Sequence, residues 1–136
     1  MTKEFNNLEE LEPYYDEKSN TYVFKEDGVS IDIKLNFNLS TGANINARNI
    51  VARDIFCHDI NAFDIIACDI VARNIVARDI DAGNIHAGDI NAEDIDYYAI
   101  CVSYNNIICK SIKGRRYNCF HKALDGEIII KEKGDK

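Results

Sequence analysis

The chain has 136 residues, a net charge of −7, 46% hydrophobic residues and no tryptophan. This length allows one small domain with a core of its own. No apolar run is long enough to cross a bilayer, and the first residues, MTKEFNNLEELE, are acidic rather than signal-like, so we expect a cytoplasmic protein that does not contact a membrane.

Two features of composition narrow the class further. The chain has 21 isoleucines but 5 leucines, and isoleucine favours strands over helices, so we expect an all-β fold. Residues 1–42 carry 4 basic and 9 acidic side chains, residues 43–103 carry 4 and 10, and residues 104–136 carry 8 and 4. We therefore expect no direct nucleic-acid binding by the acidic body, because phosphate contacts need clustered lysine and arginine.

Residues 1–42 are expected to cap the N-terminal end of the domain. The stretch NLEELEPYY predicts a short helical turn. TYVF, an EDG turn and VSIDIKLNFNL then predict a β-hairpin or edge strand with one buried face, because apolar and polar residues alternate. The apolar positions of this stretch are Ile31, Ile33, Leu35, Phe37 and Leu39.

Residues 43–121 contain a five-residue repeat. Isoleucine occupies every fifth position from 45 to 100; Asp or Asn precedes it eleven times in twelve, and alanine follows two residues later nine times. The register slips by two residues and resumes at Ile107. Residues two apart in an extended segment point to the same side, so Ile and Ala face inward while the remaining residues turn a corner. The repeat predicts a solenoid whose coils are stabilised by stacking on one another.

This repeat resembles that of the pentapeptide-repeat proteins. The resemblance implies a right-handed parallel β-helix in which about 20 residues form one square coil that rises ~4.8 Å. The flanking segments would add capping β-hairpins to it. Such a coil would stack Ile75 between Ile55 and Ile95. The order differs from the family pattern in one respect, because alanine here follows the large residue, whereas the small inward residue of the family precedes it.

Residues 122–136 are expected to form a C-terminal β cap, because ALDGEIIIKEK places a turn before a β-branched run that closes the last coil.

The cysteines and histidines do not indicate a disulfide framework, a metal site or a catalytic site. The five cysteines include no CxxC pair, which favours reduced thiols; Cys57, Cys109 and Cys119 are expected inside and Cys68 outside. No histidine stands at a metal-ligand spacing, and no nucleophile or phosphate-loop motif is present, so we expect no metal, no cofactor and no enzymatic activity. The histidines are His58, His86 and His121.

The Asp/Asn position before each isoleucine has two interpretations. The family resemblance implies an array of negative charge that imitates DNA, because pentapeptide-repeat proteins that protect DNA gyrase from quinolones have DNA-like acidic surfaces. Alternatively, these side chains bond neighbouring backbone groups at corners. Interchange of Asp with Asn favours the second interpretation for most of the ladder and leaves mimicry to a subset. The acidic members are Asp54, Asp59, Asp64, Asp69, Asp79, Asp89 and Asp94.

Apolar residues at outward positions predict an interface. Stacking of such square coils would place Val51 above Val71 and join seven side chains in one patch, used for self-association or for a foreign partner. The alternative is ordinary strand propensity on a sheet face. The patch is Val51, Arg53, Phe56, Val71, Arg73, Val76 and Arg78.

One basic cluster, Lys113, Arg115 and Arg116, interrupts the acidic pattern. It either contacts nucleic acid or an acidic partner, or it is a solvated face.

These observations predict a non-enzymatic interaction protein. The first hypothesis is an inhibitor or protector that occupies the nucleic-acid site of a DNA-handling enzyme, such as gyrase or a nuclease. A phage-encoded inhibitor of a host defence nuclease would use the same physics. The rival hypothesis is a scaffolding module that forms homodimers or larger homo-oligomers through its apolar faces.

Overall fold

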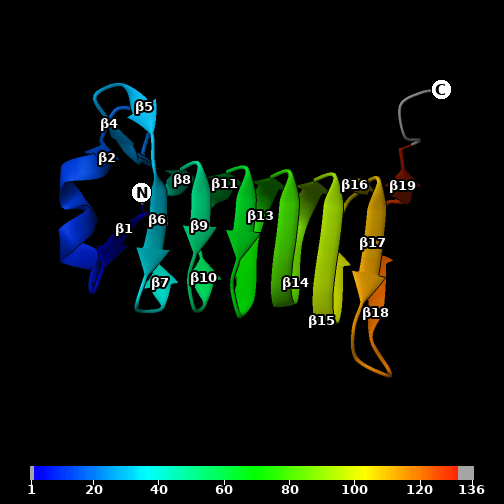
Figure 1. Ribbon diagram of the computed structural model, residues 1–136. Coiled ribbons are helices and arrows are strands. Elements are labelled where there is room, and N and C mark those ends of the chain that lie inside the picture. Colours follow the sequence, from blue (N-terminus) through cyan, green and yellow to red (C-terminus); the bar gives the residue numbers. More distant parts are fainter. Residues whose placement is uncertain (1, 132–136) are drawn as a thin grey trace.

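The computed structural model describes residues 2–131, which form a parallel β-solenoid (Figure 1). The stacking period follows from the strand register. Ile55 pairs with Ile70, and Ile60 pairs with Ile75. Each partner lies three repeat units further along the chain, so three units form one coil with three faces.

The all-β parallel β-helix predicted from the sequence is confirmed, but the square coil of four units is wrong. Ile75 stacks between Ile60 and Ile90, not between Ile55 and Ile95. A square encloses more than twice the area of a triangle with the same side. Protein interiors are filled to high density, and the inward isoleucines and alanines fill the narrower triangular section.

The N-terminal end is covered by a cap. It comprises β1 (Thr2–Phe5), the 3-10 helix η1 (Leu8–Tyr14), β2 (Tyr15–Asp16), and the antiparallel hairpin of β4 (Lys25–Glu26) with β5 (Val29–Ser30). Leu11 and Phe24 are fully buried beneath this cap. The hairpin turns at Asp27 and Gly28, which both have positive φ. Coil stacking begins before residue 43, because strands of the 21–39 segment already pair with the first repeats.

The coils have three faces, which we call A, B and C in chain order. Face A contains β3 (Thr21–Val23), β8 (Asn44–Asn46), β11 (Asp59–Asn61), β16 (Ile107–Cys109) and β19 (Ile128–Ile130). Face B contains β6 (Asp32–Leu35), β9 (Asn49–Val51), β12 (Asp64–Ile66) and β17 (Ser111–Gly114). Face C contains β7 (Leu39–Ser40), β10 (Ile55–Phe56) and β18 (Phe120–Ala123).

Three longer strands turn corners and serve more than one face. β13 (Asp69–Val76) serves faces C and A, β14 (Asp79–Asn91) serves all three, and β15 (Asp94–Ser103) serves faces B and C.

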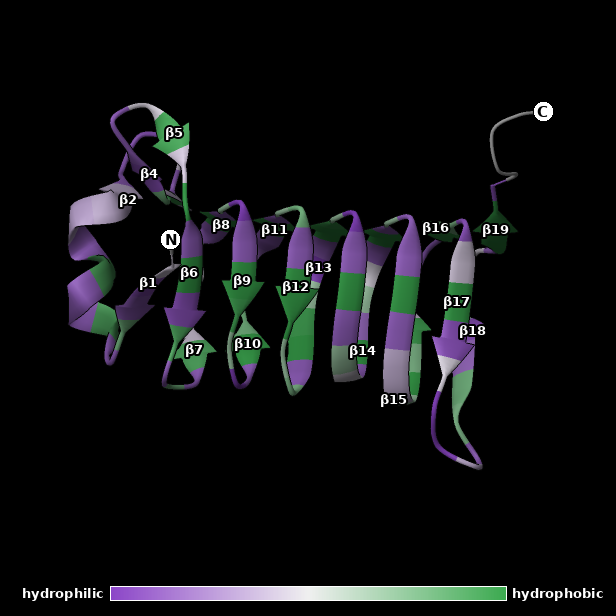
Figure 2. Cartoon of the chain, in the orientation of Figure 1, coloured by the Kyte–Doolittle hydropathy of each residue, from purple (hydrophilic) through white to green (hydrophobic). Residues whose placement is uncertain are grey.

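The core is a set of isoleucine columns, one on each face. Ile60, Ile75 and Ile90 of face A are each 1% exposed, and the alanines two residues later are buried beside the corners. In Figure 2 each coil shows a hydrophobic segment bordered by hydrophilic ones, and these segments align along the solenoid. Because one coil alone buries too little apolar area, its stability comes from its neighbours.

The two-residue register slip begins within β15, and its second residue is gained between Ser103 and Ile107. Cys101, not Ile100, pairs with Ile85 in the inward column, and Ile100 pairs with Asn84. The slip between Ala82 and Asn84 shows that the coil has gained a residue next to the buried ring of Tyr97. Ile100 therefore takes the place of an Asp or Asn rather than continuing the inward isoleucines.

At the C-terminal end, Ile128–Ile130 of the expected cap form strand β19 on the preceding coil, but the expected hairpin is not formed among the described residues. β18 and β19 lie parallel to the preceding coil and complete one more coil, rather than forming a hairpin. The segment between β17 and β18 projects from the solenoid (Figure 1). Of the predicted 122–136 cap, residues 132–136 lie outside the described residues.

Candidate functional site

The acidic positions do not form one ladder, because the three-unit coil distributes them over three faces. Asp59 and Asp89 lie on face A, and Asp54 and Asp69 lie on face C. The remaining three members, Asp64, Asp79 and Asp94, are consecutive in the ladder of face B.

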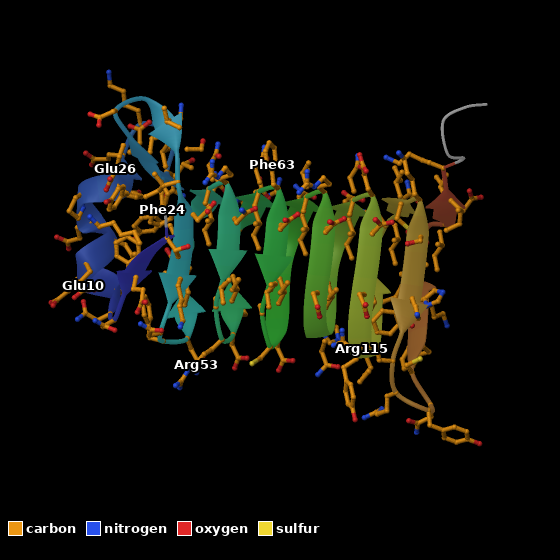
Figure 3. All side chains as sticks on the ribbon, viewed as in Figure 1. Glu10, Phe24, Glu26, Arg53, Phe63 and Arg115 are labelled. Atoms are coloured by element: carbon orange, nitrogen blue, oxygen red, sulfur yellow. The ribbon has the colours of Figure 1, made fainter. Side chains whose placement is uncertain are left out.

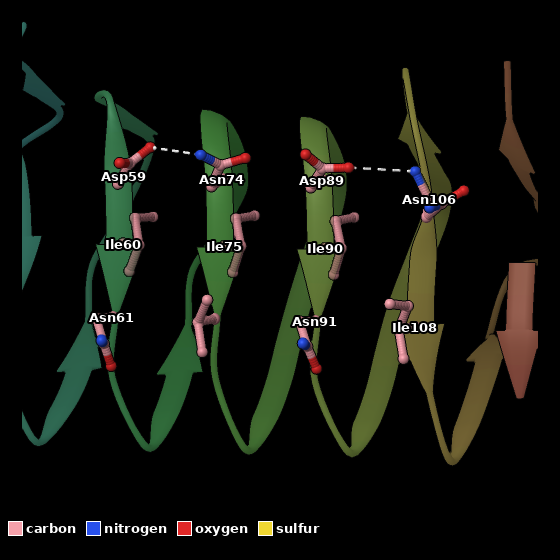
Figure 4. A pocket seen from close by; sticks show the side chains of 11 residues that line it. Asp59, Ile60, Asn61, Asn74, Ile75, Asp89, Ile90, Asn91, Asn106 and Ile108 are labelled. Carbon is pink, nitrogen blue, oxygen red and sulfur yellow. Dashed lines mark hydrogen bonds between the residues drawn. The ribbon is translucent and has the colours of Figure 1, made fainter. Parts of the chain in front are cut away.

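On face A the ladder alternates between amide and carboxylate, which satisfies its own hydrogen bonds (Figure 4). Asn44 Oδ1 accepts from the backbone N–H of Asp59 at 3.1 Å, and Asn74 Nδ2 donates to Asp59 Oδ1 at 3.1 Å. The backbone N–H of Asn106 donates to Asp89 Oδ1 at 3.3 Å. On face A, hydrogen bonding at the corners is therefore enough to explain the Asp/Asn position.

Face B lacks this alternation. Asp79 stacks between Asp64 and Asp94, and ionised carboxylates carry only acceptors, so no member of the trio can donate to another. Burial raises the pKa of the Asp79 carboxyl, and the charges of Asp64 and Asp94 raise it further. The adjacent outward positions, Asp81 and Asp96, also stack on each other. We call these five aspartates the acidic surface.

Two arginines partly neutralise the acidic surface. Arg78 lies 3.3 Å from an oxygen of Asp64 and 3.9 Å from one of Asp79. Arg115 Nη1 contacts Asp81 at 2.8 Å and Asp96 at 3.0 Å. Five carboxylates against two guanidinium groups and the neighbouring Lys113 leave a net negative surface, which lines a shallow groove with Ile66 and Ile80.

The basic cluster of the sequence is divided by the structure. Lys113 extends the outward column of face B beyond Asp96, and Arg115 turns toward the aspartates. Arg116 instead lies over the ring of Tyr98, with its Cζ 6.0 Å from the ring centroid. The three side chains therefore do not form one site.

The seven residues expected as one patch are also separated, since their grouping assumed a coil of four units. Val51 stacks with Ile66 on face B, and Phe56 stacks with Val71 on face C. Val76 stands on face A next to Asn61 and Asn91. The arginines occupy three different corners: Arg53 between faces B and C, Arg73 between C and A, and Arg78 between A and B.

Comparison of the chain with family models, curated proteins and solved structures returned no match. The functional proposal therefore rests on the faces alone.

Residues 2–131 contain neither a candidate membrane-spanning helix nor a candidate metal site. No helix in this part of the chain is long and apolar enough to cross a membrane. Within the same residues, no three or more His, Cys, Asp or Glu side chains are grouped so as to hold a metal ion.

The thiols lie largely as the repeat predicts. Cys57 and Cys109 are buried, Cys68 is exposed and Cys119 is half-buried. Burial raises the pKa of the thiols of Cys57 and Cys101 to about 12, so both are protonated at neutral pH and unreactive as nucleophiles.

Sequence reasoning missed Asp81 and Asp96, because they occupy the outward position after an isoleucine rather than the repeated Asp/Asn position. Their signal was the DID tripeptide, which occurs at 79–81 and again at 94–96, three repeat units later. That spacing places both tripeptides on the same face and at adjacent coils.

Proposed function

We propose that the protein is a non-enzymatic interaction protein whose acidic surface docks on the basic, nucleic-acid-binding site of another protein. The partner would be a DNA-handling enzyme such as a gyrase or a nuclease. A phage-encoded inhibitor of a host nuclease would act through the same chemistry. The observation that carries the proposal is the uninterrupted stack of Asp64, Asp79 and Asp94 on face B.

We expect this stack to lower stability, because like charges lie directly opposite each other on neighbouring strands. On face A, an asparagine between two aspartates supplies the donor that a carboxylate lacks. The same substitution at Asp79 would remove like-charge repulsion and keep the corner geometry. Arg78 offsets only part of the repulsion. Features that break a local rule are commonly functional, which supports a role for the charge itself.

Before its arginines are counted, the acidic surface carries somewhat more than half of the linear charge density of duplex DNA. Five carboxylates over three coils of ~4.8 Å each correspond to about one per 3 Å of axis, and duplex DNA carries one charge per about 1.7 Å. Arg78 and Arg115 reduce the net value but also fix the orientation of the carboxylates they contact.

The test compares two double variants that each remove two charges. Asp79→Asn with Asp94→Asn alters the acidic surface, and Asp59→Asn with Asp89→Asn alters face A. Wild type and the face A variant should capture the same set of DNA-binding proteins from a nuclease-treated bacterial lysate, and rising salt should release them.

The face B variant should lose that set. Retention of the same proteins by the face B variant, or capture that is insensitive to salt, would contradict the proposal.

A second candidate is a scaffold that self-associates through apolar positions. It is favoured by the stacked pair of Val51 and Ile66, which are 37% and 51% exposed on face B. Sedimentation velocity of Ile66→Glu tests it. A concentration-dependent assembly of wild type that the variant lacks supports the scaffold, and identical sedimentation of a monomer excludes this pair as the contact.

A further inference from the structure

The arginines divide into two groups by their partners. Arg48 pairs with Asp32 at 2.8 Å, and Arg78 and Arg115 pair with aspartates of face B. Within residues 2–131, the other three arginines have no carboxylate within salt-bridge distance. These are Arg53, Arg73 and Arg116.

All three unpaired arginines border face C. The backbone N–H of Cys68 donates to the carbonyl oxygen of Arg53, and the backbone N–H of Arg116 donates to that of Tyr98. These bonds place Arg53 and Arg116 at the corner between faces B and C. Arg73 lies at the opposite corner, where its Nη1 is 3.0 Å from His58 Nε2. In Figure 3, Arg53 and Arg115 lie along the lower edge of the solenoid and Phe63 along the upper edge.

The outward column of face C contains no carboxylate among the described residues. It consists of Ser40, Phe56, Val71, His86, Val102 and Lys122. Asp54 and Asp69 stand on the ladder of this face, and Asp125 stands at its last corner.

Aromatic rings accompany these cations. Phe56 is 58% exposed, and Tyr98 and Tyr104, at the two corners of the face, are 50% and 58% exposed. Phe120 adds a fourth exposed ring at the C-terminal end of the same face. Exposed rings beside unpaired guanidinium groups are the combination that binds bases by stacking and phosphates by charge.

Glycines keep the middle of face C open. A Cβ on Gly83 would lie 2.6 Å from the carbonyl oxygen of Cys68, and one on Gly88 would lie 2.6 Å from that of Arg73. The coil can therefore stack at both corners only without side chains there. As a consequence, His86 stands between two corners that carry no side chain.

We propose that face C binds a short segment of single-stranded nucleic acid. Its phosphates would lie along Arg53, Arg73 and Arg116, and its bases would stack on Phe56 and Tyr98. From Phe56 to Lys122 the face spans four coil steps, about 19 Å at ~4.8 Å each, which suits a segment of a few nucleotides.

This proposal is independent of the acidic surface, because it uses a different face. We expected no nucleic-acid binding by the acidic body because its charge was summed over all three faces. The unpaired cations of face C instead lie at its two corners, Arg53 and Arg116 at one and Arg73 at the other. The net charge of −7 still repels a polyanion, so binding is expected at low salt and should weaken steeply as salt rises.

The experiment measures fluorescence anisotropy of a dye-labelled oligothymidylate with the full chain, from low to physiological salt. The single strand should bind more tightly than a duplex of equal length, whose bases are not free to stack. Phe56→Ala should weaken binding by about 5- to 150-fold, the range for loss of one stacked base, and leave the salt slope unchanged. Arg73→Gln should weaken binding and reduce the slope by about 0.7.

Matched controls exist on the other side of the molecule. Phe63 is 56% exposed, close to Phe56, and Arg78 borders faces A and B. Phe63→Ala and Arg78→Gln should leave oligonucleotide affinity within about twofold of wild type. Asp79→Asn with Asp94→Asn should leave it unchanged or tighter, so failure here is distinguishable from failure of the acidic-surface proposal.

Three outcomes would overturn the assignment. The first is no binding of the single strand at low salt. The second is equal loss in Phe56→Ala and Phe63→Ala. The third is equal binding of the duplex together with full competition by polyaspartate, which would identify an acidic protein as the ligand of face C.

Discussion

Replacing Asp79 by asparagine should stabilise the protein, although it removes a native charge from the surface. Asp79 stacks between Asp64 and Asp94 in a parallel ladder. Two carboxylates one strand spacing apart, ~4.8 Å, repel by about 0.9 kcal/mol in water, and screening at physiological salt reduces this to about half. Two such neighbours give about 1 kcal/mol.

The arginine at this position offsets part of the repulsion. Arg78 Nε is 3.9 Å from Asp79 Oδ2, and that attraction is lost in the variant. By the same Coulomb estimate this attraction is about 0.6 kcal/mol after screening, so the net gain is about 0.3–0.5 kcal/mol, within the range for cross-strand charge pairs. Urea unfolding at pH 7, monitored by circular dichroism, measures this difference.

The gain should depend on pH with a defined sign. The folded-state pKa of Asp79 is raised above its unfolded value, so the folded protein binds the proton more tightly. The penalty from Asp79 is fully present above the raised pKa and disappears as the pH falls below the unfolded pKa. The advantage of Asp79→Asn over wild type should consequently shrink on acidification.

Asp59→Asn is the matched control. Asp59 already accepts a hydrogen bond from Asn74 at 3.1 Å, so this substitution removes one charge without relieving a carboxylate stack. We expect no gain in the free energy of unfolding. Equal stabilisation by both substitutions would mean that the overall charge matters rather than the stack, and destabilisation by Asp79→Asn would refute the reasoning.

Three further predictions test the coil itself. Ile75→Ala should cost about 2–5 kcal/mol in urea unfolding, because Ile75 is 1% exposed in the isoleucine column; a change below about 1 kcal/mol would contradict its inward position. Thiol labelling of the native protein should modify Cys68 long before Cys57, whose thiol is buried and has a pKa of about 12; the reverse order would shift the inward frame. Gly83→Ala should lower the free energy of unfolding by about 1–3 kcal/mol, because its Cβ would meet a carbonyl oxygen at 2.6 Å. Gly42→Ala should be neutral, because the space around Gly42 is open. Equal shifts of the melting temperature in the two variants would argue against tight corner stacking.

The sequence determines which residues face inward, because each five-residue unit has the same local geometry. The alternation at Ile45, Ala47 and the following repeats therefore predicts the buried columns correctly. The number of units in one coil is not contained in that period. It depends on the corner angle and on how well isoleucine and alanine fill the section, which is a property of all coils packed together.

The residues of the candidate site could not be grouped from the sequence for the same reason. Whether Phe56 has Val71 or Val76 above it follows only from the coil length, and a change of one unit moves a residue to another face. Signals of the three-unit period do exist in the sequence. The DID tripeptides at 79–81 and 94–96 and the Asp59–Asn74 pair recur at that spacing, but each repeats too few times to be read without the structure.

The slip at Ile100 shows a second limit. The isoleucine pattern continues there by one more repeat, yet Cys101 fills the inward position. The large ring of Tyr97, which replaces an inward alanine and bonds His121 Nδ1 at 2.6 Å, occupies the corner next to this slip. An extra residue accommodates that corner, and the periodic count shows a slip before Ile107 without placing this residue before Ile100.

Chemical cross-linking tests the three-faced coil of three repeat units most directly. In a Cys68→Ser background, cysteines at Phe56 and Val71 should be joined by a short bifunctional thiol reagent, because these residues are paired neighbours on face C. Cysteines at Phe56 and Val76 should remain unlinked, because Val76 lies on face A. Peptide mass spectrometry identifies the product. A link between 56 and 76 with none between 56 and 71 would indicate a square coil of four units and would contradict the division into faces A, B and C.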